Sequence, residues 1–119
     1  MANVLKTSAA LAAALLLSAC GAPGQEFVGS WQYEDLRYRS IIEIQRTDDL
    51  VFNITKSTYR IPLSSMEAVS LDPTVSKGIL RLENERLVAV DQPMAFITYD
   101  KPTESIKIGV LGVTYARVP

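Results

Sequence analysis

Histidine is absent from this 119-residue chain, and cysteine occurs once, as Cys20. Without histidine no imidazole can serve in acid–base catalysis, and one cysteine can form neither an intrachain disulfide nor a Cys/His metal cluster. A charge excess of either sign is also lacking, since 12 basic and 13 acidic side chains give a formal net charge of −1. Nucleic-acid binders carry a large basic excess, so we expect no nucleic-acid partner and no metal site.

Long hydrophobic runs are missing as well. The apolar run near the N-terminus covers only residues 9–17, whereas a membrane-spanning helix needs about 20 apolar residues. A positive residue, Lys6, precedes this run, and small residues follow it. This order of features is typical of a secretory signal peptide rather than of a membrane span.

The apolar run ends in Leu17-Ser18-Ala19-Cys20. This tetrapeptide resembles the lipobox of bacterial lipoproteins, in which a leucine and two small residues precede an obligatory cysteine. The resemblance implies that residues 1–19 are a cleaved signal peptide and that the Cys20 thiol carries diacylglycerol. Two or three fatty acyl chains, such as palmitate, would anchor the protein permanently, because each buried CH₂ contributes about 0.8 kcal/mol. An ordinary secretory signal with a spare cysteine is the alternative.

Gly21 follows the expected lipidation site. In lipoproteins of Gram-negative bacteria, Asp at this position usually retains the protein in the inner membrane. The resemblance therefore implies a lipid anchor in the outer membrane, with the protein facing the periplasm. The short segment of residues 20–26 predicts a flexible tether of at most about 20 Å. Loss of Lys6 with the signal would change the net charge from −1 to −2, which would not draw the protein onto an anionic leaflet.

From residue 27 onward the chain has no sustained period of 3.6 residues. Short runs of period two, rich in Ile, Val, Thr, Tyr and Phe, predict an all-β domain over residues 27–119, and the length allows one domain. The expected strands cover residues 27–34, 37–46, 50–56, 59–63, 77–83, 86–90, 94–99, 105–110 and 112–118, while residues 66–71 fit a strand or a helical turn. Eight or nine strands joined by short turns must be antiparallel. We expect a small up-and-down barrel, which hides its edges, with a sandwich as the alternative.

The first and last strands carry a second resemblance. Gly29-Ser30-Trp31 and the late Arg117 are similar to the G-x-W motif and the final-strand basic residue of lipocalin-like (calycin) barrels. The resemblance implies that Gly29, Trp31 and Arg117 close the base of the barrel, with the indole as a plug and the guanidinium packed across it. The chain is shorter than a full lipocalin, and its Thr98-Tyr99-Asp100 has another letter order than the family's T-D-Y. Another small barrel or sandwich remains the alternative.

Catalytic residues are not evident. No nucleophile has an elbow motif or an S-x-x-K partner, and Asp48-Asp49 is typical of a turn rather than of a catalytic carboxylate pair. We therefore expect a protein that is not an enzyme and that has no cofactor. Arg37 and Arg39 share one strand face and are candidates for a partner contact, with a solvated face paired to neighbouring carboxylates as the alternative.

The inward-facing residues of the expected strands are mostly large. An eight-stranded barrel is just wide enough to be filled by side chains or to hold one small molecule. These residues predict a filled lumen, with a ligand pocket as the alternative. They are Trp31, Tyr33, Ile42, Ile44, Leu50, Phe52, Ile54, Leu80 and Leu82.

Two functional hypotheses follow from the sequence. The first is a non-catalytic, membrane-anchored interaction or accessory module of the cell envelope, held by lipid on Cys20 and contacting an envelope protein. The second is a lipocalin-like binder of a small apolar ligand. A lipid-anchored lysozyme inhibitor ranks third, because it is suggested by architecture alone.

Overall fold

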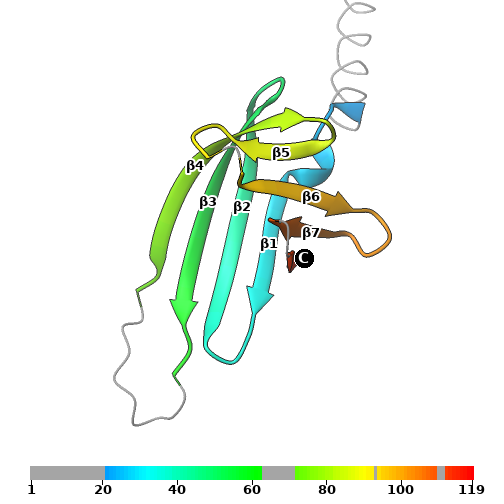
Figure 1. Ribbon diagram of the computed structural model, residues 1–119. Helices are drawn as coiled ribbons and strands as arrows, with labels where there is room; N and C mark the ends of the chain where they lie inside the picture. The colour runs from blue at the N-terminus through cyan, green and yellow to red at the C-terminus, as the bar shows by residue number, and fades with distance from the viewer. Residues whose placement is uncertain (1–20, 63–71, 93, 110–111) are drawn as a thin grey trace, which may run out of the picture.

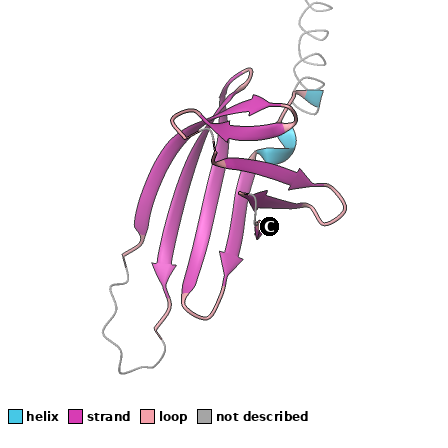
Figure 2. Ribbon diagram, in the orientation of Figure 1, coloured by secondary structure: helices cyan, strands magenta, loops and turns pink. Residues whose placement is uncertain are grey.

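Eight strands follow one another around a closed barrel, each antiparallel to its neighbours (Figure 1 and Figure 2). The computed structural model describes residues 21–62, 72–92, 94–109 and 112–119. The strands are β1 (Gly29–Glu34), β2 (Tyr38–Asp48), β3 (Val51–Arg60), β4 (Thr74–Glu83), β5 (Arg86–Ala89), β6 (Phe96–Asp100), β7 (Ser105–Ile108) and β8 (Val113–Arg117), preceded by a 3₁₀ turn, η1 (Gln25–Phe27). The prediction of a small all-β barrel is confirmed.

The barrel closes where its last strand returns to its first. Trp31 in β1 is opposite Ile42 in β2 and opposite Arg117 in β8. Side chains along β2 alternate between the interior and solvent, with Ser40, Ile42 and Ile44 buried, because successive residues of a strand point to opposite faces. The alternating sequence pattern thus corresponds directly to the inner and outer faces of the barrel.

The strand boundaries differ from the prediction at β3. Residues 50–56 and 59–63 were expected to be separate strands, but β3 runs continuously from Val51 to Arg60 against β2. The strand ends just before Pro62, whose ring nitrogen cannot donate to a ladder. Residues 66–71 lie outside the described part of the chain.

The core gathers at one end of the long strands. Its buried members are Phe27, Trp31, Ile42, Ile44, Phe52, Leu80, Leu87, Ile97, Ile106 and Tyr115. Tyr33, Ile54 and Leu82 are partly buried against this cluster, as expected. Leu50 was expected to face inward but is 47% exposed. It lies in the β2–β3 turn, after a register shift between Arg46 and Asp48, so the alternation does not extend to it.

Residues 22–28, here called the strap, fold onto the same end of the barrel. Gly24 is buried, with its backbone in the left-handed region at φ 81°, and the N–H of Phe27 donates to its carbonyl at 3.0 Å. A Cβ at Gly24 would lie 2.7 Å from the Phe52 ring, so only glycine fits. The expected flexible tether of residues 20–26 is therefore corrected: from Ala22 onward this segment belongs to the fold.

Candidate functional site

The plugged end of the barrel is built around Trp31. Its indole N–H donates to the Phe27 carbonyl at 2.9 Å, which satisfies the only polar atom of a fully buried ring. The guanidinium of Arg117 lies 4.1 Å from the ring centroid. One Arg117 nitrogen donates to Val28 O at 3.0 Å and the other to Glu26 O at 2.8 Å. These contacts are structural, and they join the strap, the first strand and the last strand.

Gly29 provides the space for this arrangement. Its φ of 136° lies in a region that L side chains rarely adopt, and a Cβ there would be 2.7 Å from Arg117 Nη1. The three residues singled out in the sequence, Gly29, Trp31 and Arg117, thus lie together at one end of the barrel. They leave no space for a ligand there, because Phe27 and Trp31 fill it.

The inner wall becomes polar toward the other end of the long strands. The Tyr115 hydroxyl donates to Ser40 Oγ at 2.9 Å, and both side chains are buried. Tyr33 lies on the same inner face and donates from its hydroxyl to Asp35 Oδ2 at 3.0 Å. That hydrogen bond raises the pKa of Tyr33 above its ordinary value. Hydrogen bonds from both tyrosines, together with the contact between their rings at a centroid distance of 5.7 Å, therefore hold this end of the barrel.

Asp35 organises the β1–β2 turn. Its Oδ1 accepts from the backbone N–H of Arg37 and of Tyr38, both at 2.8 Å. These two hydrogen bonds, followed by the Tyr33 hydroxyl, lower the pKa of the Asp35 carboxyl. The carboxylate therefore fixes the turn in its ionised form.

A partly open cavity of about 360 Å³ lies between β3–β4 and the segment from β5 to β6. The β4–β5 ladder covers only the end of β4 from Leu80, and the β5–β6 ladder joins only two residue pairs. The flank between the first half of β4 and β6 is therefore not closed by a ladder among the described residues. The cavity is lined by Ile42, Ile54, Lys56, Ser76, Lys77, Gly78, Ile79, Leu80, Ala89, Asp91, Gln92, Ala95, Phe96, Ile97 and Ile108.

The floor of the cavity is apolar and its mouth is polar. Lys56 in β3 is opposite both Ile42 in β2 and Ser76 in β4. Directly opposite residues of antiparallel strands share a face, so Lys56 and Ser76 project to the inner side, where Ile42 is buried. Both are exposed at the mouth. A cationic and a hydroxyl group thus border an interior made of isoleucine, leucine and phenylalanine side chains.

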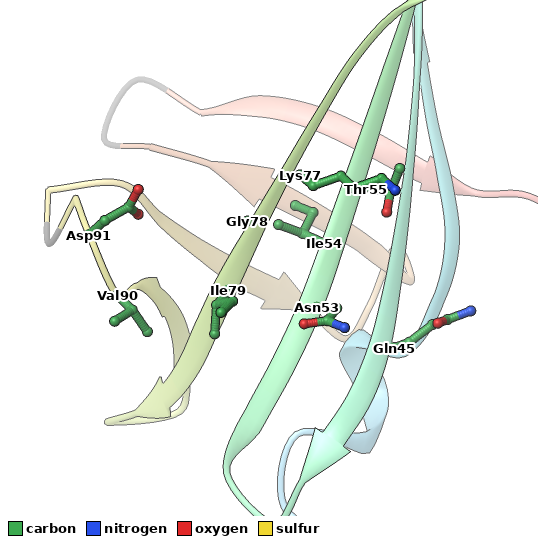
Figure 3. A pocket seen from close by; sticks show the side chains of 9 residues that line it. All are labelled: Gln45, Asn53, Ile54, Thr55, Lys77, Gly78, Ile79, Val90 and Asp91. Carbon is green, nitrogen blue, oxygen red and sulfur yellow. The ribbon is translucent and has the colours of Figure 1, made fainter.

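A second hollow, a groove of about 650 Å³, lies on the outer face of the same strands (Figure 3). Its lining residues are Gln45, Asn53, Ile54, Thr55, Lys77, Gly78, Ile79, Val90 and Asp91. Thr55 and Lys77 are direct cross-strand neighbours at one end of this groove, while the N–H of Val90 donates to Ile79 O at the other. Amide, hydroxyl and charged groups make up a larger share of the lining here than in the cavity, so the groove is the more polar of the two.

Gly78 is one of the five residues that line both hollows. It is opposite Ile54, and a Cβ at this position would be 3.4 Å from Ile54 Cγ2. Sequence reasoning singled out neither Gly78 nor Ala89 nor Lys56. They could have been identified as small or charged residues at inward-facing strand positions, because the other inward-facing residues are mostly large and apolar.

The remaining sequence candidates lie apart from the cavity. Arg37 is in the β1–β2 turn, and Arg39 forms an exposed ion pair with Glu34 at 3.8 Å. Asp48 and Asp49 are at the β2–β3 turn, as expected for turn residues. Within the described ranges, no group of three or more Cys, Asp or Glu side chains is arranged to hold a metal ion.

No protein-family model matches the chain, no characterised protein matches it, and no solved structure matches it. Among the residues that the structure describes, no helix is long and apolar enough to cross a membrane.

Proposed function

We propose that this chain is a lipid-anchored β-barrel of the cell envelope, facing the periplasm from the outer membrane, that binds a small, mainly apolar molecule without catalysis. The observation that carries the proposal is the partly open cavity of about 360 Å³ between β3–β4 and the segment from β5 to β6. Small-molecule sites are commonly concave, mostly apolar hollows of about 300–1,000 Å³ with a few polar groups. The cavity is at the lower end of that range, so the ligand is small.

The chemistry of the lining indicates what kind of molecule fits. Ile42, Ile54 and Leu80 provide an apolar surface, which favours a hydrocarbon or a ring system. Lys56 and Ser76 at the mouth favour one polar or anionic group on the same ligand, because that group could stay hydrated while the apolar part is buried. We propose an amphiphile, oriented with its polar end toward Lys56.

The anchor is supported by the sequence pattern that ends in Cys20. Replacement of Cys20 by Ser removes the thiol that would receive the lipid, so the variant is expected to leave the membrane fraction. A Cys20→Ser protein that still fractionates with membranes contradicts the anchor and leaves the ligand proposal standing.

The ligand proposal is tested by titrating the purified protein with a fluorescent apolar amphiphile that carries one anionic group. Gly78→Leu is the blocking variant, because a side chain beyond Cβ at this position would extend toward Ile54 and the cavity. Val75→Leu places the same leucine side chain on the outer face of the same strand, where Val75 is 50% exposed, and is the control.

Wild-type protein and Val75→Leu are expected to bind the probe with the same affinity, while Gly78→Leu binds at least tenfold more weakly, about 1.4 kcal/mol. Circular dichroism of the three proteins should be the same. Equal binding by a folded Gly78→Leu protein contradicts a site in the cavity.

A second candidate function is supported by the β1–β2 turn. Leu36 at its tip is 86% exposed, and Arg37 and Arg39 follow it in sequence. An exposed leucine beside two arginines is a suitable contact for an envelope protein, which is the interaction-module hypothesis. Photo-crosslinking from position 36 in cells tests it, and the absence of any protein adduct would contradict it.

A further inference from the structure

The strap is joined to the β2–β3 turn by one side chain. Arg46 Nη2 donates to the Pro23 carbonyl at 2.5 Å and to Gln25 Oε1 at 3.4 Å. Its other terminal nitrogen, Nη1, donates to the Asp49 carbonyl in the turn. The Arg46 guanidinium also lies 4.7 Å from the centroid of the Phe52 ring, which holds it in place. The strap and this turn therefore form one surface.

The strap is also fixed further along. Arg117 donates to the carbonyls of Glu26 and Val28, and Gly24 is buried against Phe52. The N–H of Gln25 donates to Ala22 O at 3.1 Å, so the fixed segment begins at Ala22. Only Gly21 separates this segment from Cys20.

Chain length then limits how far the barrel can stand from its anchor. Consecutive residues advance by at most about 3.3–3.6 Å, so Cys20 lies within about 10 Å of Pro23. Acyl chains on Cys20 would hold that residue at the membrane surface. The strap and the β2–β3 turn must then lie beside the headgroups, whatever the net charge of the domain.

We propose that the surface formed by the strap and the β2–β3 turn rests on the lipid bilayer, with Leu50 as its apolar contact. Leu50 is 47% exposed at the tip of that turn. Figure 1 places η1 and the β2–β3 turn at one end of the long strands and the β1–β2 turn at the opposite end. Leu36 therefore points away from the membrane. This inference rests on the proposed acylation of Cys20.

Single-cysteine variants can test this orientation, because Cys20 is the only cysteine in the chain and acylation would leave it without a free thiol. Leu50→Cys and Leu36→Cys, both at exposed turn positions, are labelled with an environment-sensitive fluorophore. The full lipidated protein is then placed in phospholipid vesicles that contain a lipid-attached quencher. Position 50 is expected to be quenched several-fold more than position 36.

A lengthened tether provides the matched control. Insertion of about ten Gly and Ser residues between Gly21 and Ala22 leaves every barrel contact intact but frees the barrel from the surface. Quenching at position 50 should fall to the level at position 36, while the protein stays in the vesicle fraction. Equal quenching at the two positions in vesicle-bound protein with the native tether overturns the orientation. Loss of the protein from the vesicle fraction, by contrast, overturns the anchor on which the inference rests.

Discussion

The guanidinium of Arg117 lies 4.1 Å from the ring centroid of Trp31 and simultaneously donates to two backbone carbonyls, Val28 O and Glu26 O. Arg117 is at the end of β8, Trp31 is within β1, and the two carbonyls flank Phe27. A single side chain thus connects the last strand, the first strand and the strap. This contact holds the strap, which covers this end of the barrel, against the first and last strands.

Truncation of Arg117 should therefore destabilise the fold. A cation over an aromatic face contributes about 0.5–2 kcal/mol and a hydrogen bond to a charged group about 1.5–3 kcal/mol, but these terms are not additive and Arg117 is exposed. We expect Arg117→Ala to lose about 2 kcal/mol of unfolding free energy, and Arg117→Lys, which keeps only the charge, to lose less. Urea unfolding followed by Trp31 fluorescence measures both variants. Arg81→Ala, at an exposed position of β4, is the control and should change by less than about 0.5 kcal/mol. An equal loss in Arg81→Ala and Arg117→Ala would refute this role.

Gly29→Ala should be more harmful than the same change at Gly78. At Gly29 the backbone has φ 136° and the new Cβ would lie 2.7 Å from Arg117 Nη1, so strain and a lost contact combine. We expect a loss of about 2–3 kcal/mol. At Gly78 the nearest atom would be 3.4 Å away, and the change is expected to be within about 1 kcal/mol of zero. Similar urea midpoints for the two variants would show that Gly29 is not constrained.

Acid should weaken the β1–β2 turn through Asp35. The backbone N–H groups of Arg37 and Tyr38 lower the pKa of this carboxyl in the folded state. Because the pKa is lowered in the folded state, the ionised Asp35 stabilises the fold at pH values above the pKa of the unfolded chain, about 3.9. This stabilisation is lost as the pH falls through the lower pKa of the folded state. Wild-type protein should therefore lose more unfolding free energy than Asp35→Asn when the pH is lowered below about 4. Urea unfolding of both proteins from pH 7 downward measures the difference, and parallel pH profiles would contradict it.

The residue after Cys20 should decide the membrane to which the protein is sorted. If the lipobox is functional, Gly21 directs the protein to the outer membrane, and Gly21→Asp should retain it in the inner membrane. The strap begins at Ala22, so this substitution leaves the barrel contacts unchanged. Density-gradient separation of the two membranes measures the shift, and an unchanged distribution with intact acylation would contradict the sorting proposal.

The fold was predictable because apolar and polar residues alternate along the long strands. The alternation of Ser40, Ile42 and Ile44 gave the correct inner face of β2, and the turn chemistry of Asp48-Asp49 gave the β2–β3 hairpin. The pattern failed at Leu50 because a register shift just before it interrupts the alternation. Such a shift depends on how the strands pair in the closed barrel, and the local sequence contains no pattern that indicates it.

The candidate site was less predictable than the fold. Large inward residues predicted a filled lumen; most of them are buried in the core, but a partly open cavity of about 360 Å³ lies beside β4. The short strand β5 and two small residues, Gly78 and Ala89, border the cavity. Which strands face each other across a barrel depends on stagger and tilt, and these are global properties that a strand-by-strand reading does not contain.

The strap was misread for a related reason. Its composition of Gly, Ala, Pro and Gln is typical of a linker, yet Arg46 and Arg117 fix its carbonyls from strands that are distant in sequence. Every residue has a backbone carbonyl that can accept a hydrogen bond. The sequence of the segment therefore does not indicate whether an arginine from a distant strand binds its carbonyls.

Native mass spectrometry of the lipidated protein, extracted gently from its own membranes, tests the central proposal most directly. We expect the mass of an acylated Cys20 together with one retained small amphiphile, and loss of that amphiphile in Gly78→Leu but not in Val75→Leu. An acylated protein that carries no small molecule, in wild type and variants alike, would contradict a ligand in the barrel.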